Sequence, residues 1–296
     1  MSGFSDSLRA EFPSLARAVG AFRLPAVAQE PAPWAVVSAL GASLLVASVL
    51  RLVLFVAPSS LQAPSFPLPL GATWNSIITL ASHVVAGAVL LRAGGRAALW
   101  WYAGLVALQV ATSLPGILLF CDRSGGQLGM QDGGCNVPLL YVAAGRAPEW
   151  IGVAIGALLS RSLPARGPGA NVLLRGAGAY WLALIALATP LGMLSSAGRL
   201  NDQIAQTLLY VTVNIVAAAI AGFVLRRARF AAALLVALAI IGPGLGFAVP
   251  LVRNGGPDAE PLSMTLARWS SVLASAGAGG ALVLAWVIGR RRGTFF

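Results

Sequence analysis

The chain has 296 residues, of which 58% are apolar and only 10% are charged, and its formal net charge is +11. About a quarter of the residues of a soluble globular domain are charged, so this composition excludes a single water-soluble core. The high apolar content also excludes a disordered chain. The composition therefore predicts an all-α, polytopic integral membrane protein.

Residues 1–33 precede the first long apolar run. Apolar residues recur there at helical spacing, with Arg9, Arg17 and Arg23 among them. This pattern favours a cytoplasmic segment that forms an amphipathic helix at the membrane surface, and a frayed tail fits it as an alternative. Because no apolar stretch typical of a signal peptide comes before Trp34, we do not expect a secretory signal.

Eight apolar runs follow, and each is long enough to cross a bilayer, which requires about 20 residues in a helix. The runs are continuously apolar and do not alternate, which favours helices over the strands of a barrel. We predict eight transmembrane helices at 34–57, 73–91, 97–120, 138–159, 176–197, 204–225, 230–252 and 265–289.

The arginines predict how this bundle is oriented. All twenty basic residues are Arg, and most lie in the N-terminal segment, in alternate interhelical turns and in the tail 290–296. The positive-inside rule places these segments and both termini in the cytoplasm. Arginine without lysine, beside abundant Ala and Gly, is typical of a GC-rich bacterium and predicts the inner membrane. We expect membrane lipid, and no nucleic acid, to be the partner of the basic segments.

The only two cysteines, Cys121 and Cys135, lie in the predicted loop between the third and fourth helices. The predicted topology puts this loop outside the cytoplasm, where disulfides persist. We predict a disulfide that closes the Gly-rich loop, worth about 3 kcal/mol in the loop-entropy model. Two free thiols are the alternative.

The two halves of the chain share features that indicate a parallel duplication of four helices each. Trp34 and Trp181 both open a span, the second and sixth spans both end in Leu-Arg, and prolines stand at 115 and 250. The predicted halves are 34–159 and 176–289, joined by a cytoplasmic linker at 160–175. Tryptophan at interfaces and arginine at helix ends occur in any membrane protein, so an unduplicated bundle stays open.

Arg146 and Glu149 are the clearest candidate site. They are three residues apart in the predicted fourth helix, so they share one helix face, and Pro148 between them can kink that helix. Ionisable groups inside a membrane are costly and are functional candidates by default. If Glu149 is ionised, we expect it to pair with Arg146, and if it is neutral, it can carry a proton. A purely structural ion pair, and a location in the outer loop, are the alternatives.

His83 is a second candidate, because it lies near the middle of the predicted second helix and can relay a proton or bind a ligand. A hydrogen-bonded packing role is the alternative. The outer arginines can form the mouth of an anion site or extend to lipid headgroups. These outer arginines are Arg51, Arg146, Arg199, Arg253 and Arg268.

The absence of lysine excludes Schiff-base chemistry, and the single histidine excludes a bis-His haem and an HExxH zinc site. We therefore expect no cofactor and no metal. Three functions remain, and the first is a transporter whose Arg146 binds an anion while Glu149 or His83 carries a proton. The second is a non-catalytic subunit that assembles with other membrane subunits or with copies of itself. The third is a membrane-embedded transferase acting on a lipid-linked substrate.

Overall fold

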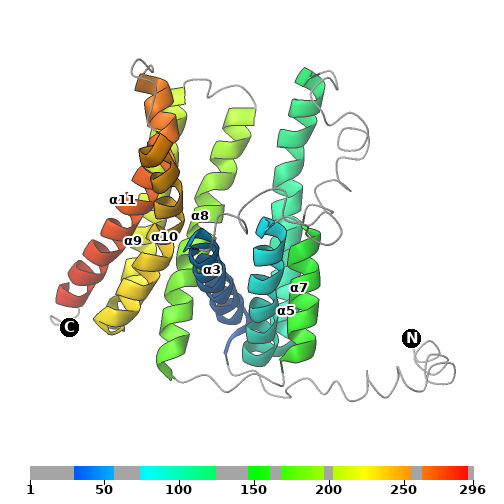
Figure 1. Cartoon of the computed structure of the whole chain (residues 1–296). Helices are drawn as coiled ribbons and strands as arrows, with labels where there is room; N and C mark the ends of the chain where they lie inside the picture. The colour runs from blue at the N-terminus through cyan, green and yellow to red at the C-terminus, as the bar shows by residue number, and fades with distance from the viewer. Residues whose placement is uncertain are drawn as a thin grey trace.

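The computed structural model describes residues 30–56, 74–124, 146–160, 168–196, 203–254 and 262–292, and within these residues the fold is entirely helical (Figure 1). The elements are α3 (Ala32–Val56), α5 (Trp74–Ser124), α7 (Ala147–Leu159), α8 (Pro168–Ser196), α9 (Gln203–Val224), the short 3₁₀ helix η2 (Leu225–Arg227), α10 (Phe230–Asn254) and α11 (Leu262–Arg292). The predicted all-α class is therefore confirmed for this part of the chain.

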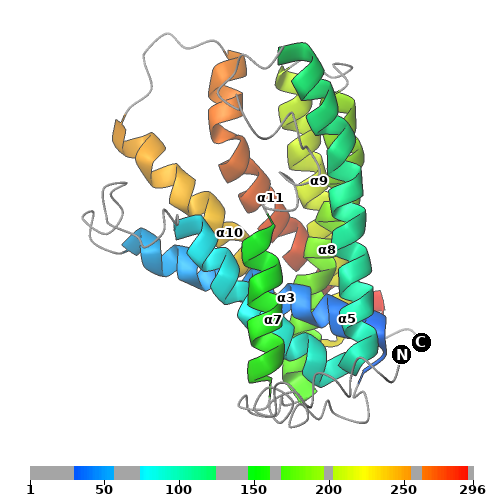
Figure 2. The ribbon, with the colours of Figure 1, turned by 90° about the vertical axis from the view of Figure 1, so that its right-hand side faces the viewer.

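Helix α5 consists of two limbs that meet at Gly95. The backbone of Gly95 has φ 61° and ψ −153°, a conformation that side chains rarely allow and that glycine adopts freely. The chain turns back on itself there, so the limbs 74–94 and 96–124 run side by side (Figures 1 and 2). The two limbs correspond to the second and third predicted spans.

Five helical stretches of the described chain are long and apolar enough to cross a membrane. They are Ala32–Leu54, Ser76–Thr112, Asn171–Leu191, Ile204–Arg227 and Trp269–Arg291. Two further apolar stretches are shorter, Ala147–Leu159 and Phe230–Gly242. Large apolar side chains on the surface, such as Trp100 at 79% and Val53 at 63% exposure, would be unfavourable in water and suit contact with lipid. The structure therefore supports a membrane helical bundle.

Each half of the described chain has its own apolar core. The first core joins α3, α5 and α7, and it includes Leu40, Leu90 and Tyr102. The second core joins α8, α9, α10 and α11. In addition, α8 contributes side chains to the first core, and α3 contributes side chains to the second. The additional side chains are Leu174 and Leu182 in the first core and Leu44 and Leu45 in the second.

The two halves meet where α3 crosses α8 at Gly41 and Gly178. A Cβ atom added to Gly41 would collide with the backbone carbonyl of Leu174, and one added to Gly178 would collide with that of Val37. Only glycine allows the two backbones to come this close, as in other small-residue crossings of membrane helices. Ser48 on α3 also donates a hydrogen bond of 2.9 Å to the Ala239 carbonyl on α10. Helices α3 and α10 are both strongly inclined in Figure 2.

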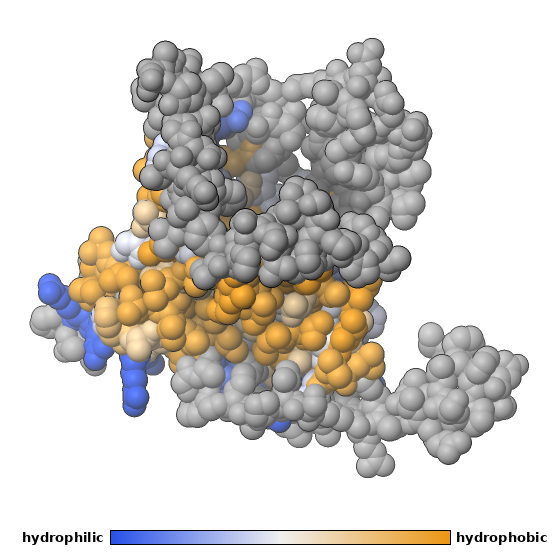
Figure 3. Space-filling model, in the orientation of Figure 1, coloured by the Kyte–Doolittle hydropathy of each residue, from blue (hydrophilic) through white to orange (hydrophobic). Residues whose placement is uncertain are grey.

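The basic ends of the helices gather at one end of the molecule. In Figure 1 the turn of α5, the end of α7, the start of α8, the η2 turn and the end of α11 all lie at the lower end. Figure 3 shows an apolar band across the described surface, with hydrophilic residues projecting below it. Arginines at these ends are Arg92, Arg96, Arg226, Arg227, Arg229, Arg290, Arg291 and Arg292.

Candidate functional site

Arg146 and Glu149 form an ion pair at the first turn of α7. Nη1 of Arg146 donates hydrogen bonds of 3.0 Å to both carboxylate oxygens of Glu149. The Arg146 side chain is 31% exposed and that of Glu149 is 19% exposed, so both charges are largely removed from solvent. The predicted contact between these residues is present, and it neutralises two charges within an apolar bundle.

The position of this pair along its helix differs from the prediction. We expected a helix from Pro138, with Pro148 kinking its interior, whereas α7 begins at Ala147 and places Pro148 in the first turn. Proline suits a first turn because the missing N–H would have no partner there. Residues 125–145 lie outside the described part of the chain. Glu149 is therefore near the N-terminal end of a 13-residue helix, where the helix dipole favours its negative charge.

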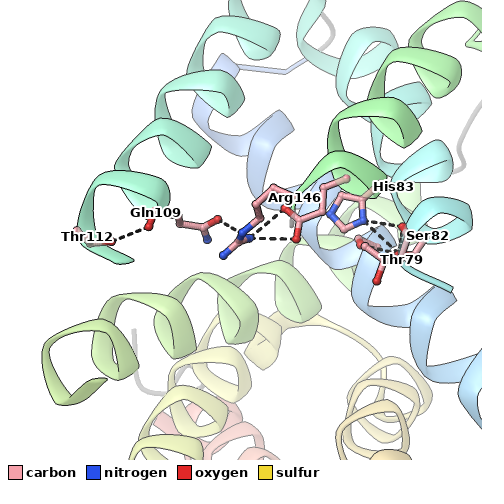
Figure 4. Close-up of polar contacts among 8 residues, drawn as sticks. Thr79, Ser82, His83, Gln109, Thr112 and Arg146 are labelled. Atoms are coloured by element: carbon pink, nitrogen blue, oxygen red, sulfur yellow. Dashed lines mark hydrogen bonds and ion pairs between the residues drawn. The ribbon is translucent and has the colours of Figure 1, made fainter. Parts of the chain in front are cut away.

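Gln109 on the second limb of α5 also holds Arg146. Nη1 of Arg146 donates a hydrogen bond of 3.1 Å to Oε1 of Gln109, and Thr112 donates one of 3.1 Å to the Gln109 backbone carbonyl (Figure 4). The sequence analysis did not connect Gln109 to the charge pair. This contact fixes the guanidinium between α5 and α7.

One edge of the Arg146 guanidinium meets no hydrogen-bond acceptor among the described residues. Within the described residues, every hydrogen bond of Arg146 runs through Nη1. Nε and Nη2 lie together on another edge of the planar group, in the geometry that binds a carboxylate or phosphate through two parallel hydrogen bonds. The arrangement can therefore accept an anion without first breaking the ion pair with Glu149.

His83 lies on the first limb of α5, where its ring is held by the backbone. Nδ1 of His83 is 2.8 Å from the Thr79 carbonyl, and since a carbonyl only accepts, Nδ1 carries the hydrogen. In the neutral ring Nε2 is then the nitrogen that can accept a proton. Ser82 also donates to the Thr79 carbonyl at 2.9 Å, and Ser43 on α3 donates to Ser82 at 3.2 Å.

The contact between α5 and α7 brings His83 close to the charge pair. A Cβ atom added to Gly152 on α7 would lie 2.8 Å from Cβ of His83. Glu149 precedes Gly152 by three residues, so it lies on the same face of α7, one turn away. Figure 4 shows the contacts around Arg146 and those around His83 in the same region between the helices. These candidate residues therefore occupy one part of the fold.

Tyr102 belongs to the same region, and the sequence analysis missed it. Its side chain is 4% exposed in the first core, and it lies near enough to Glu149 and Arg146 for their charges to act on its hydroxyl group. Tyr102 follows two tryptophans, a pattern typical of an aromatic residue at the membrane interface. One sequence feature could have indicated this residue: Tyr102 precedes Gln109 by two helical turns, so both side chains lie on one face of α5.

Of the other predicted residues, Arg51 has a described side chain, and the structure does not bring it to this site. Arg51 is exposed on α3 and has no hydrogen bond or ion pair with Arg146 or Glu149 in the described part of the chain. Arg268 lies in α11, but its side chain is outside the described residues, as is Cys135. Cys121 lies in the last turns of α5 and not in a loop, and its side chain is not described. The predicted disulfide therefore falls outside the described residues.

A second group of charged side chains lies at the basic end, and the sequence analysis did not predict it. Glu30 is 6% exposed, and its Oε2 atom accepts a hydrogen bond of 3.2 Å from Ser38 and lies 3.5 Å from Nη2 of Arg175. The Glu30 N–H donates to the Ala93 carbonyl at 2.9 Å. This group connects the start of α3 to α8 and to the turn of α5, so its position suggests a structural role.

Comparisons with protein families, with characterised proteins and with solved structures find no match to this chain.

Proposed function

We propose that the chain is a transporter of the bacterial inner membrane whose Arg146–Glu149 site binds a small anion together with a proton. The observation that carries this proposal is the largely buried ion pair, with 31% and 19% of the two side chains exposed. Ionisable groups that are largely removed from solvent in an apolar bundle are costly to keep, and they mark substrate and proton pathways in membrane proteins.

The geometry supports coupling between the anion and the proton. An anion bound at the Nε and Nη2 edge of Arg146 would share the positive charge that stabilises the Glu149 carboxylate. A second negative charge nearby favours protonation of Glu149, so binding of the anion and of the proton would reinforce each other. The loaded site would then carry no additional net charge, which lowers the electrostatic cost of moving it across the membrane.

His83 would deliver the proton in this proposal. Its Cβ atom lies beside Gly152, one turn from Glu149, and its Nδ1 is held by the Thr79 carbonyl at 2.8 Å. Nε2 is therefore the ring nitrogen that exchanges the proton.

Transport assays in vesicles test this proposal. We would load purified protein into lipid vesicles and offer chloride, inorganic phosphate, acetate, lactate and succinate under an inward proton gradient. We expect at least one of these anions to accumulate and Arg146→Ala to slow its initial uptake at least about tenfold, because one charge-assisted bidentate contact is worth more than a tenfold change in affinity. Glu149→Gln should retain anion exchange and lose accumulation driven by protons.

The control is Arg96→Ala, which removes the same charge from the exposed turn of α5 and should leave uptake unchanged. Equal uptake of all five anions by the unmodified protein and by Arg146→Ala would contradict the proposed function.

We further propose that the chain crosses the membrane eight times, with its basic end in the cytoplasm. The turn at Gly95 divides the 51-residue helix α5 into two limbs, each of which would be a separate crossing. The lower end in Figure 1 carries the arginines, and the positive-inside rule assigns that end to the cytoplasm.

Cysteine labelling tests this threading. In a background with Cys121→Ser and Cys135→Ser, we expect Arg96→Cys and Arg291→Cys to react with an impermeant maleimide only after the membrane is permeabilised. Arg123→Cys should react in intact cells, because it lies at the far end of the second α5 limb. Labelling of Arg96→Cys from outside would contradict two separate crossings by α5.

We also propose that the two halves arose by duplication. Gly41 and Gly178 form the crossing between the halves, while Gly87 packs on α7 in the first half and Gly222 packs on α11 in the second. The separation along the chain between Gly41 and Gly178 is nearly the same as that between Gly87 and Gly222. The two Leu-Arg helix ends, at Arg92 and Arg226, are separated by nearly the same length as well. Trp34 and Trp181 are further apart along the chain. We therefore align the two proposed repeats by their glycines and not by these tryptophans.

A non-catalytic membrane subunit is the second candidate function. One observation favours it: Nη1 of Arg146 is bound both by Glu149 and by Gln109, which suits an ion pair that only fixes helix packing. Extraction in mild detergent discriminates between the candidates. A subunit should co-purify with a partner in fixed stoichiometry, whereas the transporter should retain uptake activity after purification to a single component.

A further inference from the structure

We infer that a groove at the basic end of the bundle binds an anionic phospholipid. The groove has a volume of about 600 Å³ and lies between α3, α8, α9 and η2, and no residue of α7 lines it. Its wall combines three arginines with an apolar floor, and it is independent of the proposed transport site. The lining residues are Trp34, Val172, Arg175, Ile220, Phe223, Val224, Arg226 and Arg227.

The charge of the groove matches a phosphate headgroup. None of the described residues that line it is acidic. Glu30 lies 3.5 Å from Arg175 and compensates that charge, but Arg226 and Arg227 form no ion pair with any described residue. Both are exposed in η2, directly after α9, so two positive charges remain to meet an anion. Basic pockets between membrane helices on the cytoplasmic side are a recurring form of headgroup recognition.

The apolar part of the groove matches an acyl chain. Ile220 is 42% exposed and Phe223 is 44% exposed on α9, and both lie above the arginines along the helix, on the side of the apolar band. A free phosphate ion would leave these side chains uncovered, whereas a phospholipid would cover them and place its headgroup at the arginines.

Arg175 is held in position at the edge of the groove. The centre of its guanidinium lies 5.2 Å from the centroid of the Trp34 ring, a distance typical of a cation–π contact. The Trp34 ring, Arg175 and the Glu30 carboxylate therefore form one ordered wall. A wall that is already ordered loses little conformational freedom when a lipid binds.

Native mass spectrometry of the full chain tests this site. We would add dioleoyl phosphatidylglycerol, dioleoyl phosphatidylcholine or inorganic phosphate to the delipidated protein in detergent. We expect one tightly bound phosphatidylglycerol, with phosphatidylcholine and inorganic phosphate bound at least about tenfold more weakly. The double variant Arg226→Ala/Arg227→Ala should weaken phosphatidylglycerol binding by about thirtyfold, since each arginine near an anionic lipid contributes about fivefold.

Two further variants test whether a loss of lipid binding is due to this groove. The alternatives are a lower net positive charge of the protein and misfolding. Arg290→Ala/Arg291→Ala removes the same charge from the same end of the molecule but from outside the groove, and it should bind the lipid normally. Arg226→Lys/Arg227→Lys keeps the charges and should recover most of the binding. Equal weakening by both alanine pairs, or equal binding of phosphatidylglycerol and inorganic phosphate, would overturn the proposal.

Discussion

Gly178→Ala is expected to destabilise the protein by about 1–3 kcal/mol, the usual cost of forcing an extra carbon into a packed interior. A Cβ atom at Gly178 would lie 2.6 Å from the carbonyl carbon of Val37 and 3.0 Å from the Gly41 nitrogen. These atoms belong to the backbone of α3, so they cannot rotate away, and the two helices must separate. The separation would also loosen both cores, because α3 and α8 contribute side chains to each of them. Thermal unfolding in detergent measures the loss as a lower melting temperature.

Gly280→Ala is the matched control, because a Cβ atom there meets no atom within 4 Å. Alanine has the higher helix propensity by up to about 1 kcal/mol, so this variant should be neutral or slightly more stable. If the two substitutions shift the melting temperature equally, the close crossing of α3 and α8 does not stabilise the bundle.

Arg146→Gln is expected to destabilise the protein by about 2 kcal/mol. The substitution leaves the Glu149 carboxylate, 19% exposed, without its cation. Breaking a fully buried pair costs about 3–5 kcal/mol, and the cost here is smaller because nearly a third of the Arg146 side chain is exposed. A second substitution, Glu149→Gln, removes the uncompensated charge, so the double variant should recover at least half of the lost stability.

A double-mutant cycle on unfolding in denaturing detergent measures this coupling. Recovery of stability in the double variant, combined with loss of anion uptake, would show that the pair serves binding as well as packing. Additive effects of the two single substitutions would contradict a direct ion pair between Arg146 and Glu149.

Much of the helical framework could be predicted from the sequence. The thickness of a bilayer sets how many apolar residues a crossing needs, so hydropathy alone predicted the approximate place of most helices in the described chain. The predicted break between 91 and 97 brackets Gly95, where α5 turns. The contact between Arg146 and Glu149 also follows from sequence, because residues three apart on a helix are neighbours wherever the helix lies.

The start of α7 could not be predicted in the same way. Pro148 is compatible with a kink inside a long helix and with the first turn of a short one. The apolar residues from 138 onward fit either arrangement in lipid. The structure places Arg146 just before the helix and Glu149 in its first turn, which changes the predicted position of the pair along the helix but not the contact.

Hydropathy was enough to predict a membrane helical bundle and the approximate place of most helices in the described chain, and spacing along one helix was enough to predict the ion pair. The contact of Gln109 with Arg146, and those of Arg175 with Glu30 and Trp34, join separate helices and could be found only from the folded structure. Lipid and neighbouring helices are equally apolar, so hydropathy does not distinguish the face of a helix that meets lipid from the face that meets protein. The close approach of backbones at glycines such as Gly41 and Gly178 selects those faces.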